Sequence, residues 1–226
     1  LKPGDTVVEA GCGWGGLARH MAKHYGANVR SYNISHQQIV YAREKAKQQA
    51  VDHLVEYIED DYRTINGEYD VFVSVGMLEH VGISHFATLG EVIQRSLKKN
   101  GRGLIHSIGR NQPGKMNAWI QKRIFPGAET PSLSQISSIF ENQLSVLDIE
   151  NIRLHYAKTL RHWLERFNDN EEHIRTIFDE EFVRIWKLYL SGSIAAFSSG
   201  QLQLFQIIFT HNRRNDIPMT REYIYN

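Results

Sequence analysis

A glycine-rich stretch near the start of the chain carries the residues best suited to chemistry. Its sequence, EAGCGWGGLARHMA, runs from Glu9 to Ala22 and contains Gly11, Gly13, Gly15 and Gly16. The β-branched residues before it favour a buried strand, and the apolar residues at its end recur at helical spacing. Glycines at such a junction let the backbone turn sharply and let a ligand approach the free N–H groups of the helix. The stretch therefore indicates a site for a small polar ligand.

Two cofactors bind turns of this kind, and the rest of the sequence separates them. Gly11, Gly13 and Gly16 fit the G-x-G-x-x-G pattern of an NAD site, which also needs an acidic residue about 20 positions further on. Ser31 lies at that place, and residues 30–33 hold no carboxylate. The missing acid disfavours NAD.

S-adenosylmethionine is the cofactor that the acidic residues favour. Glu9 directly precedes the turn, where a carboxylate can contact the ammonium end of this cofactor. Asp60 and Asp61 follow a predicted strand, at about the place where an acid would contact the adenosine end. A solvated loop is the alternative for these two aspartates, because aspartate is mostly an exposed residue.

Strand and helix signals alternate through the first half of the chain. The predicted strands are Thr6–Ala10, Asn28–Asn33, Val55–Glu59, Tyr69–Gly76 and Arg102–Gly109. The predicted helices are Gly15–Tyr25, Ser35–Gln49 and Ser84–Lys98. Ser35 is expected to form a capping box, and Asn100-Gly101 is expected to stop the third helix. Repeated β–α units of this length predict an α/β fold with a doubly wound parallel sheet.

The second half of the chain is less regular. Short helices are predicted around Pro126 and Pro131, a strand over 143–154, helices over Tyr156–Phe167 and Phe178–Ser198, and a last strand over 201–211. We expect one domain over residues 1–226, in which the helical segments 110–143 and 156–198 cover the substrate. A helical insertion is expected between strands five and six.

Composition narrows the class of protein. The 226 residues are 42% hydrophobic and 23% charged, with a formal net charge of +1, which is typical of a globular domain and unlike a general polyanion binder. The single cysteine, Cys12, can form no internal disulfide, which favours a reducing cytoplasm. No apolar run approaches the roughly 20 residues that a membrane span needs.

A series of motifs along the chain resembles that of the cyclopropane-fatty-acid-phospholipid synthases and mycolic acid cyclopropane synthases. Besides the glycine stretch it comprises NISHQQ, DDYR, VSVGMLEHVG, LIHSIG, KRIFPG, RLHYAKTLRHWLERF and LYLSGSIAAFSSGQLQLFQIIF. The resemblance covers essentially the whole chain. It implies a mostly parallel seven-stranded sheet of the class I, Rossmann-like methyltransferases, and a cytoplasmic enzyme of lipid biosynthesis.

The resemblance also implies a set of cofactor-binding residues. The residues that match the methionine end of the S-adenosylmethionine site are Glu9, Gly11, Gly13 and Gly15. Asn33 and Gln38 match positions near the ribose, and Asp61 and Tyr62 match positions near the adenine. Asn33 departs from the threonine that is usual in the family, although it keeps a polar side chain. No metal ion is implied.

The reaction implied by the resemblance is methyl transfer from S-adenosylmethionine to the cis double bond of an unsaturated phospholipid acyl chain. An alkene is a poor nucleophile, so positioning must supply much of the rate enhancement. Loss of a proton from the added methyl group then closes a cyclopropane ring, and the implied base is bound bicarbonate. The implied bicarbonate donors are His106, the backbone N–H of Ile108 and the hydroxyl of Tyr156, while Glu79 would accept the O–H of the ion. Without the resemblance, Glu79 would be interpreted as a loop cap and His106 as a core histidine.

Aromatic residues of the second half could stabilise a carbocation, although any one of them is more often a core residue. They are Trp163, Phe167, Trp186, Tyr189, Phe197 and Phe205.

A basic stretch bears on the membrane. No acid lies between Glu91 and Glu129, whereas eight basic residues do: Arg95, Lys98, Lys99, Arg102, Arg110, Lys115, Lys122 and Arg123. Apolar Met116, Trp119, Ile120 and Ile124 recur there at helical spacing. Either a helix lying on an anionic membrane surface or a helix packed on the sheet would give this pattern.

Two other functions stay open: methylation of a small molecule on the same scaffold, and a non-catalytic cofactor- or lipid-binding paralogue. The expected partners are phospholipid acyl chains at the inner face of the membrane, with no nucleic acid and with a homodimer as one option. In the family, a cysteine of the bicarbonate site and covering helices precede the glycine turn. Ten residues precede Gly11 here, so we expect these 226 residues to be inactive by themselves.

Overall fold

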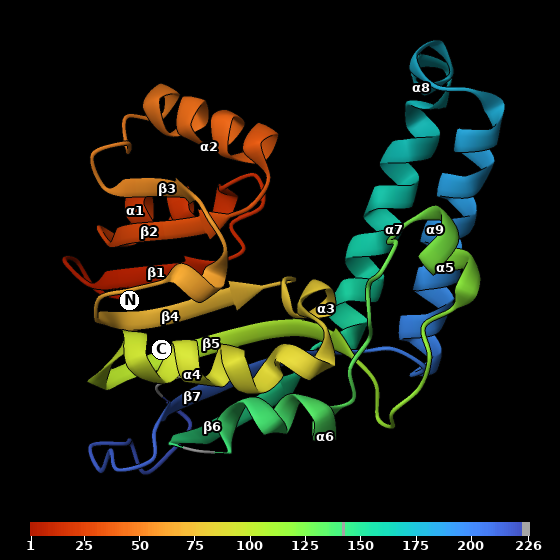
Figure 1. Cartoon of the computed structure of the whole chain (residues 1–226). Coiled ribbons are helices and arrows are strands. Elements are labelled where there is room, and N and C mark those ends of the chain that lie inside the picture. The colour runs from red at the N-terminus through yellow and green to blue at the C-terminus, as the bar shows by residue number, and fades with distance from the viewer. Residues whose placement is uncertain (142, 223–226) are drawn as a thin grey trace.

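A seven-stranded sheet in the order β3-β2-β1-β4-β5-β7-β6 forms the centre of the molecule (Figure 1). The computed structural model describes residues 1–141 and 143–222. The first five strands pair in parallel, and β7 runs antiparallel to both β5 and β6. The strands are β1 Thr6–Ala10, β2 Asn28–Asn33, β3 Val55–Glu59, β4 Tyr69–Val75, β5 Leu97–Gly109, β6 Leu144–Asn151 and β7 Gln203–His211. The predicted mostly parallel α/β sheet is confirmed.

Helices cover both faces of this sheet, and others lie beyond the carboxyl ends of its parallel strands. They are α1 Gly16–Tyr25, α2 His36–Gln48, α3 Leu78–Val81, α4 Phe86–Ser96, α5 Ala118–Arg123, α6 Leu133–Ile136, α7 Arg153–Asp169, α8 Glu171–Ile177 and α9 Glu180–Ser199. Three short 3₁₀ helices are η1 Tyr62–Thr64, η2 Ile83–His85 and η3 Ser137–Phe140. None of the helices in the described part of the chain is both long enough and apolar enough to cross a bilayer.

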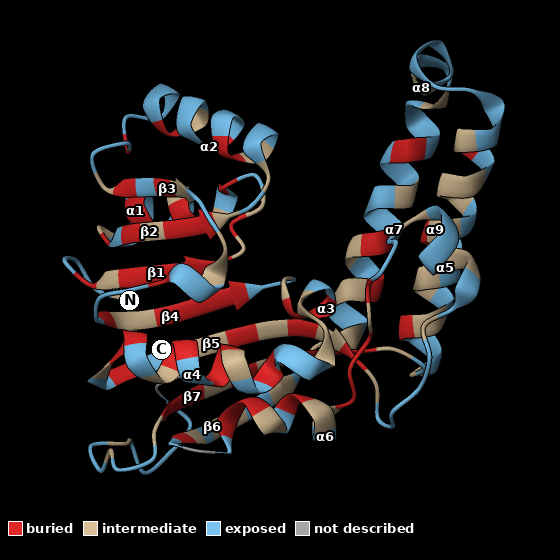
Figure 2. Ribbon diagram, in the orientation of Figure 1, coloured by how far each residue is buried: buried red, intermediate tan, exposed pale blue. Residues whose placement is uncertain are grey.

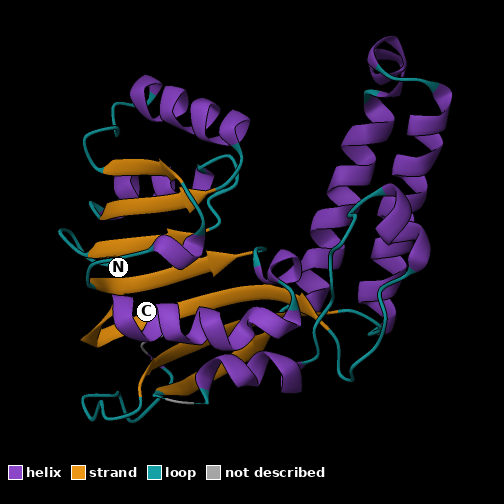
Figure 3. Ribbon diagram, viewed as in Figure 1, coloured by secondary structure: helices purple, strands orange, loops and turns teal. Residues whose placement is uncertain are grey.

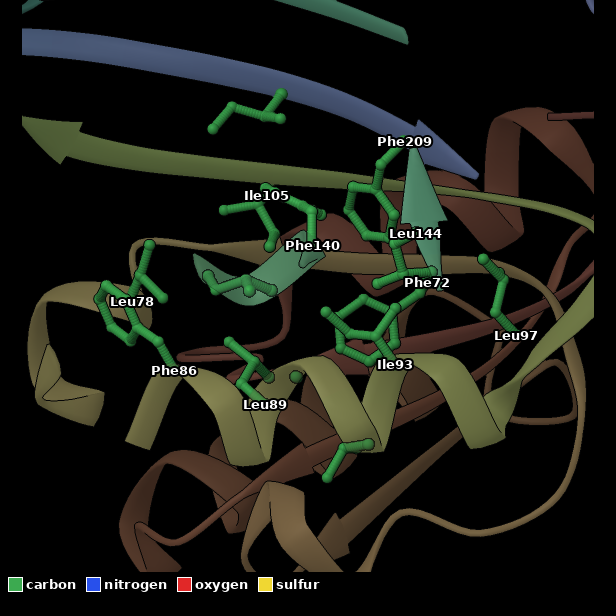
Figure 4. Close-up of a cluster of buried hydrophobic side chains, with 14 of the residues drawn as sticks. Phe72, Leu78, Phe86, Leu89, Ile93, Leu97, Ile105, Phe140, Leu144 and Phe209 are labelled. Carbon is green, nitrogen blue, oxygen red and sulfur yellow. The ribbon is translucent and has the colours of Figure 1, made fainter. Parts of the chain in front are cut away.

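The largest core lies between the sheet and the layer formed by α4, α6 and η3. Figure 4 shows side chains of α4, including Leu89 and Ile93, directed toward Phe72 and Ile105 of the sheet. A second core packs α1 and α2 on the opposite face, around Val7 of β1. Figure 2 shows the strands largely buried and the outer surface of α2 exposed. The two cores fix the strands whose carboxyl ends carry the site residues.

A hairpin of α7 and α9, with α8 at its far end, lies beyond the carboxyl ends of the parallel strands. The hairpin has its own core, which joins Leu160 of α7 to Leu190 and Phe197 of α9. The Arg153 guanidinium donates a 2.6 Å hydrogen bond to the Phe197 carbonyl and so ties the base of α7 to the end of α9. Long loops flank α5, which lies beside α9 (Figure 3).

The helical insertions lie where the sequence predicts them, whereas two predicted helix ends differ. Helices α5 and α6 lie between β5 and β6, and the longer insertion, α7–α9, follows β6 and precedes β7. Ser35 is the N-cap of α2, yet its side chain makes no capping hydrogen bond; the capping box in the described chain joins Ser132 and Gln135 instead. Gly101, predicted as a helix stop, lies inside β5, because α4 already ends at Ser96.

Candidate active site

The glycine turn between β1 and α1 depends on glycine at particular positions. Gly11, Gly13 and Gly15 have φ values of 83°, 50° and 73°, in the left-handed region that side chains disfavour. A Cβ on Gly15 would lie 2.6 Å from the Tyr57 ring, whose hydroxyl donates a 2.7 Å hydrogen bond to the Gly15 carbonyl. A Cβ on Gly13 would have no heavy atom within 4 Å, so this part of the turn is open.

Glu9 ends β1 next to this turn and is almost completely buried, with 2% of its surface exposed. Its Oε2 accepts a 2.6 Å hydrogen bond from the hydroxyl of Ser31, which is paired with Glu9 across β1 and β2. Burial raises the pKa of Glu9 to about 7, although the Ser31 hydrogen bond and the charge of Arg19 both lower it. A carboxyl group with a pKa of about 7 ionises readily when a cation lies next to it. Ser31 occupies Oε2, so Oε1 is the oxygen that can contact such a cation.

Asn33 and Gln38 meet at the same end of the sheet, as their assignment to one part of a site requires. The Asn33 amide donates a 2.7 Å hydrogen bond to the Gln38 side chain and a 3.3 Å bond to the Gly13 carbonyl. Asn33 therefore connects the end of β2 to both the start of α2 and the glycine turn. The polar side chain that departs from threonine has a defined structural role.

Asp61 and Tyr62 lie just after β3, where Asp61 caps η1. The Arg63 guanidinium donates hydrogen bonds of 2.7 Å and 2.8 Å to the two carboxylate oxygens of Asp61. These bonds hold the pKa of Asp61 below its usual range. The Tyr62 ring is half-buried against the main core. Asp61 is thus a carboxylate that is already paired with arginine at this edge of the sheet.

Glu79 occupies the short helix α3, which follows β4, and is buried with 9% of its surface exposed. Its Oε1 accepts a 2.6 Å hydrogen bond from the backbone N–H of Ile108, on the neighbouring strand β5. Among the residues that the structure describes, its buried Oε2 has no hydrogen-bond partner. Burial raises the pKa of Glu79 above its ordinary value. Buried polar atoms are rarely left unpaired, so Oε2 marks a place for a ligand that donates a hydrogen bond.

The structure brings Ile108 to Glu79 in a different role from the expected one. The sequence prediction uses the Ile108 N–H as a donor to an anion, whereas here it donates to Glu79. Two of the predicted anion donors, His106 and Tyr156, are not engaged in that bond. His106 lies two residues earlier on β5 and is half-buried, and burial lowers the pKa of its ring.

Tyr156 reaches the site from α7. Its ring makes edge-to-face contacts with Phe197 and Trp163, at centroid distances of 5.0 Å and 6.0 Å. Burial, then the charges of Tyr189 and Glu79, raise the pKa of Tyr156 to about 12. The hydroxyl is therefore protonated near neutral pH and can donate a hydrogen bond. The influence of Glu79 on this pKa places the two side chains in one electrostatic environment.

An aromatic row leads from the far end of the hairpin to α3. We define it as Phe178, Phe182, Trp186, Tyr189 and Phe125. Successive ring centroids are 4.1, 5.8, 5.2 and 5.8 Å apart, and Phe125 lies 6.0 Å from the ring of His80, the neighbour of Glu79. A cavity of about 450 Å³ opens along part of the row, between α5 and α9.

The predicted cation-stabilising aromatic residues fall into two groups. Trp186 and Tyr189 belong to the aromatic row, and Trp163 is exposed near Tyr156. Phe167 and Phe197 are buried in the hairpin core, and Phe205 is buried in the main core below the sheet. The core interpretation therefore holds for these three.

The eight basic residues do not form one surface. Lys98 donates a 2.9 Å hydrogen bond to Asp70 at the amino ends of the strands, and Arg95 donates to the carbonyl of Ile65. Only Lys122 and Arg123 lie on α5 itself, and Arg123 forms a 3.1 Å ion pair with Glu181 of α9. Ile124, the C-cap of α5, lines the cavity between α5 and α9, and the next residue, Phe125, contacts the Tyr189 ring of α9, so the end of α5 lies against α9.

Three residues of the site are not evident from the sequence: Ser31, Tyr57 and Gln206. Ser31 lies where an NAD site would need an acid, so its position in the sequence argues only against NAD. Its hydrogen bond to the buried carboxyl of Glu9 is seen only in the structure. Tyr57 is one of the two buried residues of β3, and its place in the strand pattern gives no signal of a role at the glycine turn. The amide of Gln206 lies 3.2 Å from Nδ1 of His106, and only the pairing of β5 with β7 reveals this contact.

Comparisons with known proteins agree with this geometry. A family model described as mycolic acid cyclopropane synthetase matches residues 1–207. A cyclopropane-fatty-acyl-phospholipid synthase of Escherichia coli is 37% identical over 222 residues, which cover 98% of this chain and 57% of that protein. A probable fatty acid methyltransferase of Pseudomonas putida is 37% identical over 237 residues, which cover 100% of this chain and 60% of that protein. The chain thus spans about three-fifths of the length of these relatives.

Solved structures show the same fold. The cyclopropane synthase MmaA2 from Mycobacterium tuberculosis has a TM-score of 0.85 at 23% identity, covering 92% of this chain and 79% of that one. Mycolic acid cyclopropane synthase CmaA1, in a complex with S-adenosylhomocysteine and CTAB, also has a TM-score of 0.85, at 24% identity, with the same coverage. The sheet and the helices around it are therefore those of class I methyltransferases.

Proposed function

This chain belongs to the mycolic acid cyclopropane synthetase family, and from that premise we propose that it modifies unsaturated phospholipid acyl chains with S-adenosylmethionine. In this reaction the methyl group leaves the sulfonium and forms a bond to one carbon of a cis double bond, and S-adenosylhomocysteine is the by-product. A proton then leaves the added methyl group as its carbon bonds to the second alkene carbon. The product is a cyclopropane ring. The observation that carries the proposal is the buried Oε2 of Glu79, which has no hydrogen-bond partner among the described residues and whose chain neighbour His80 contacts the end of the aromatic row.

The glycine turn and its neighbours fit S-adenosylmethionine as the methyl donor. The turn is open at Gly13, where even a side-chain carbon would meet no heavy atom within 4 Å, so a ligand can approach the backbone. Glu9 would bind the ammonium group through Oε1 while Ser31 holds Oε2. Asn33 and Gln38 would bind the ribose, and Asp61 and Tyr62 would lie near the adenine. These residues hold and orient the donor, which is how a weak alkene nucleophile is brought to reaction.

The free Oε2 of Glu79 suits a ligand that can donate a hydrogen bond, and bicarbonate carries such an O–H group. Oε2 can accept the O–H of the ion, and this hydrogen bond would orient the ion and make it a better base. His106 and Tyr156 would donate hydrogen bonds to the ion. When bound, bicarbonate would supply the base that removes the proton from the added methyl group. The Ile108 N–H supports Glu79 instead of the ion and so positions the carboxyl.

The aromatic row and its cavity fit an acyl chain as the substrate. The row presents ring faces over a path from Phe178 to Phe125, and aromatic faces both bury hydrocarbon and stabilise positive charge. The E. coli relative is named for action on fatty acyl phospholipids, and this chain is 37% identical to it. The aromatic row is an apolar path that ends at His80, the chain neighbour of Glu79, and such a path favours a lipid over a small polar substrate.

We propose that this enzyme works at a membrane surface, on the cytoplasmic side. Lys122 and Arg123 line the cavity together with the acids Asp179 and Glu181, and Arg123 is paired with Glu181. Lys122 is therefore the cation that we assign to an anionic headgroup where a chain would enter from the lipid. A basic side chain near anionic headgroups gains roughly 1 kcal/mol of attraction. This arrangement lets the acyl chain slide into the row while its headgroup stays at the surface.

Transfer of labelled methyl groups tests the proposal. The native full-length protein is incubated with S-adenosylmethionine labelled in its methyl group and with vesicles of unsaturated phosphatidylglycerol, and the lipid extract is counted. Label is expected in unsaturated but not in saturated vesicles. Trp186→Ala is expected to reduce the transfer, whereas Leu188→Ala, on the exposed side of α9, is not. Equal labelling of saturated lipid, or transfer only to a water-soluble amine, contradicts the proposal.

A further inference from the structure

Gln206 and His106 form a side-chain pair that no other part of the site explains. They are directly opposite each other in the antiparallel pairing of β7 with β5, so their side chains lie on the same face of the sheet. Nε2 of Gln206 lies 3.2 Å from Nδ1 of His106. Both residues are half-buried. The register of β5 and β7 is unbroken from Arg102 to Gly109, which makes this a rigid support.

The chemistry of the pair determines where the histidine proton lies. A side-chain amide nitrogen can donate hydrogen bonds but cannot accept them. With the amide oriented as it is in the structure, Nε2 of Gln206 faces Nδ1 of His106, so Nδ1 accepts the hydrogen bond and carries no proton. Burial lowers the pKa of His106, so the ring is neutral at pH 7 and has a single proton. That proton is on Nε2.

We propose that Gln206 is a positioning residue that holds His106 in the form protonated on Nε2, so that the ring offers a hydrogen-bond donor to an anion beside Glu79. The proposal rests on the anion-binding role that we give to His106. In the opposite form, Nε2 would carry a lone pair and would repel the anion. Gln206 thus selects a donor at a site where the Ile108 N–H is already taken by Glu79.

Glutamine is better suited to this task than an acid. A glutamate at position 206 would accept a hydrogen bond from Nδ1–H, which reverses the location of the proton and favours the charged ring. A leucine would remove the partner and leave the two neutral forms in competition. Gln206→Glu and Gln206→Leu therefore have different predicted signatures, which a purely structural role for Gln206 would not produce.

Nitrogen-15 NMR of the histidine rings measures the proton location directly. The protein is labelled at its histidines, and the His106 signals are identified as those absent from His106→Gln. In the unmodified protein near pH 7.5, we expect a protonated Nε2 and an unprotonated, hydrogen-bonded Nδ1. Gln206→Glu should move the proton to Nδ1, and Gln206→Leu should give a mixture. Gln201→Leu, the same change at an exposed residue, should leave the His106 signals unchanged.

The NMR result decides this inference independently of activity. A proton on Nδ1 in the unmodified protein would overturn it, even if neither variant folds. It would also be overturned if Gln206→Glu and Gln206→Leu both folded and kept the His106 signals. In a methyl-transfer assay, Gln206→Glu should lower kcat by about 10- to 100-fold, the scale of a lost hydrogen bond to a charged group, at unchanged affinity for S-adenosylhomocysteine. If the proton moves as expected but kcat does not change, the positioning role stands and the proposed function of His106 is contradicted.

Discussion

Oε2 of Glu9 accepts a 2.6 Å hydrogen bond from the hydroxyl of Ser31, and the two residues are paired across β1 and β2. Both side chains are buried. Burial raises the pKa of Glu9 to about 7, and the Ser31 bond opposes this rise. The carboxyl is consequently close to half protonated at neutral pH, and a cation that binds it must displace a proton.

The first prediction concerns this coupling. The affinity for S-adenosylhomocysteine should increase between about pH 6 and pH 8, with release of a proton on binding in the lower part of that range. Ser31→Ala removes the bond that favours the ionised form, so it should weaken binding at pH 7 more than at pH 8. Titration calorimetry in buffers of different ionisation enthalpy measures both quantities. Affinity that is independent of pH, or a Ser31→Ala variant that binds normally at pH 7, contradicts this account.

A second prediction concerns the ligand-free fold. The folded pKa of Glu9, about 7, is above the ordinary value of 4.5, so the folded state keeps a proton that the unfolded chain releases. The stabilising effect of that proton is complete below pH 4.5 and is lost as the pH rises through 7. Glu9→Gln has no carboxyl group to titrate at this position, so it should not show this loss. From acid to mildly basic pH, its free energy of unfolding should rise by up to about 3 kcal/mol relative to that of the unmodified protein. Denaturant unfolding at several pH values tests it, and parallel stability curves would rule it out.

A third prediction separates three glycines of the turn. Gly15→Ala should lower the free energy of unfolding by about 2 kcal/mol or more, because φ is 73° and the new carbon would lie 2.6 Å from the Tyr57 ring. Gly13→Ala meets no atom within 4 Å and should cost only about 1 kcal/mol, for its φ of 50°, while it weakens S-adenosylhomocysteine binding. Gly16→Ala, with ordinary φ at the first position of α1, is the control. The order of the three in thermal unfolding decides the matter: equal losses at Gly13 and Gly15 would show that Tyr57 does not pack as described.

A fourth prediction divides catalysis from binding. Glu79→Gln, His106→Gln and Tyr156→Phe should each reduce kcat by roughly 10²-fold, the scale of a lost acid–base function, and leave the affinity for S-adenosylhomocysteine nearly unchanged. Bicarbonate added to degassed, unmodified protein should restore its rate. Glu44→Gln and Tyr25→Phe make the same chemical changes at exposed positions of α2 and α1 and serve as controls. Parallel losses of affinity and turnover in the three variants would refute this division.

Local patterns in the sequence were sufficient for most of the fold. The strand before the glycine turn and the helix after it could be predicted because buried β-branched residues and helical spacing are short-range signals. The end of α4 could not, because Leu97 starts β5 through its pairing with Tyr69 of β4, and residues 98–101 lie in the irregular stretch before the register resumes at Arg102. Ser35 likewise has the right residue type for a capping bond that the structure does not form.

The candidate site could be predicted residue by residue only where a motif names the residue. Glu9, Asn33 and Gln38 gather at one end of the sheet, as expected, because carboxyl ends of parallel strands share an edge. The partners of these residues depend on which strands are neighbours. Ser31 meets Glu9 through β1–β2 pairing, and Gln206 meets His106 across 100 residues of chain. The use of the Ile108 N–H by Glu79 has the same origin, because it joins α3 to β5.

Mass spectrometry of lipid products tests the central claim most directly. The native full-length protein is incubated with S-adenosylmethionine, bicarbonate and vesicles of a phospholipid with one cis double bond per acyl chain. We predict a product that is heavier by one CH₂ per modified chain, has lost its alkene protons and shows cyclopropane proton signals. Glu79→Gln should yield little of it. A protein that binds S-adenosylhomocysteine yet leaves the lipid mass unchanged, or forms the ring equally well without the Glu79 carboxylate, would contradict the account.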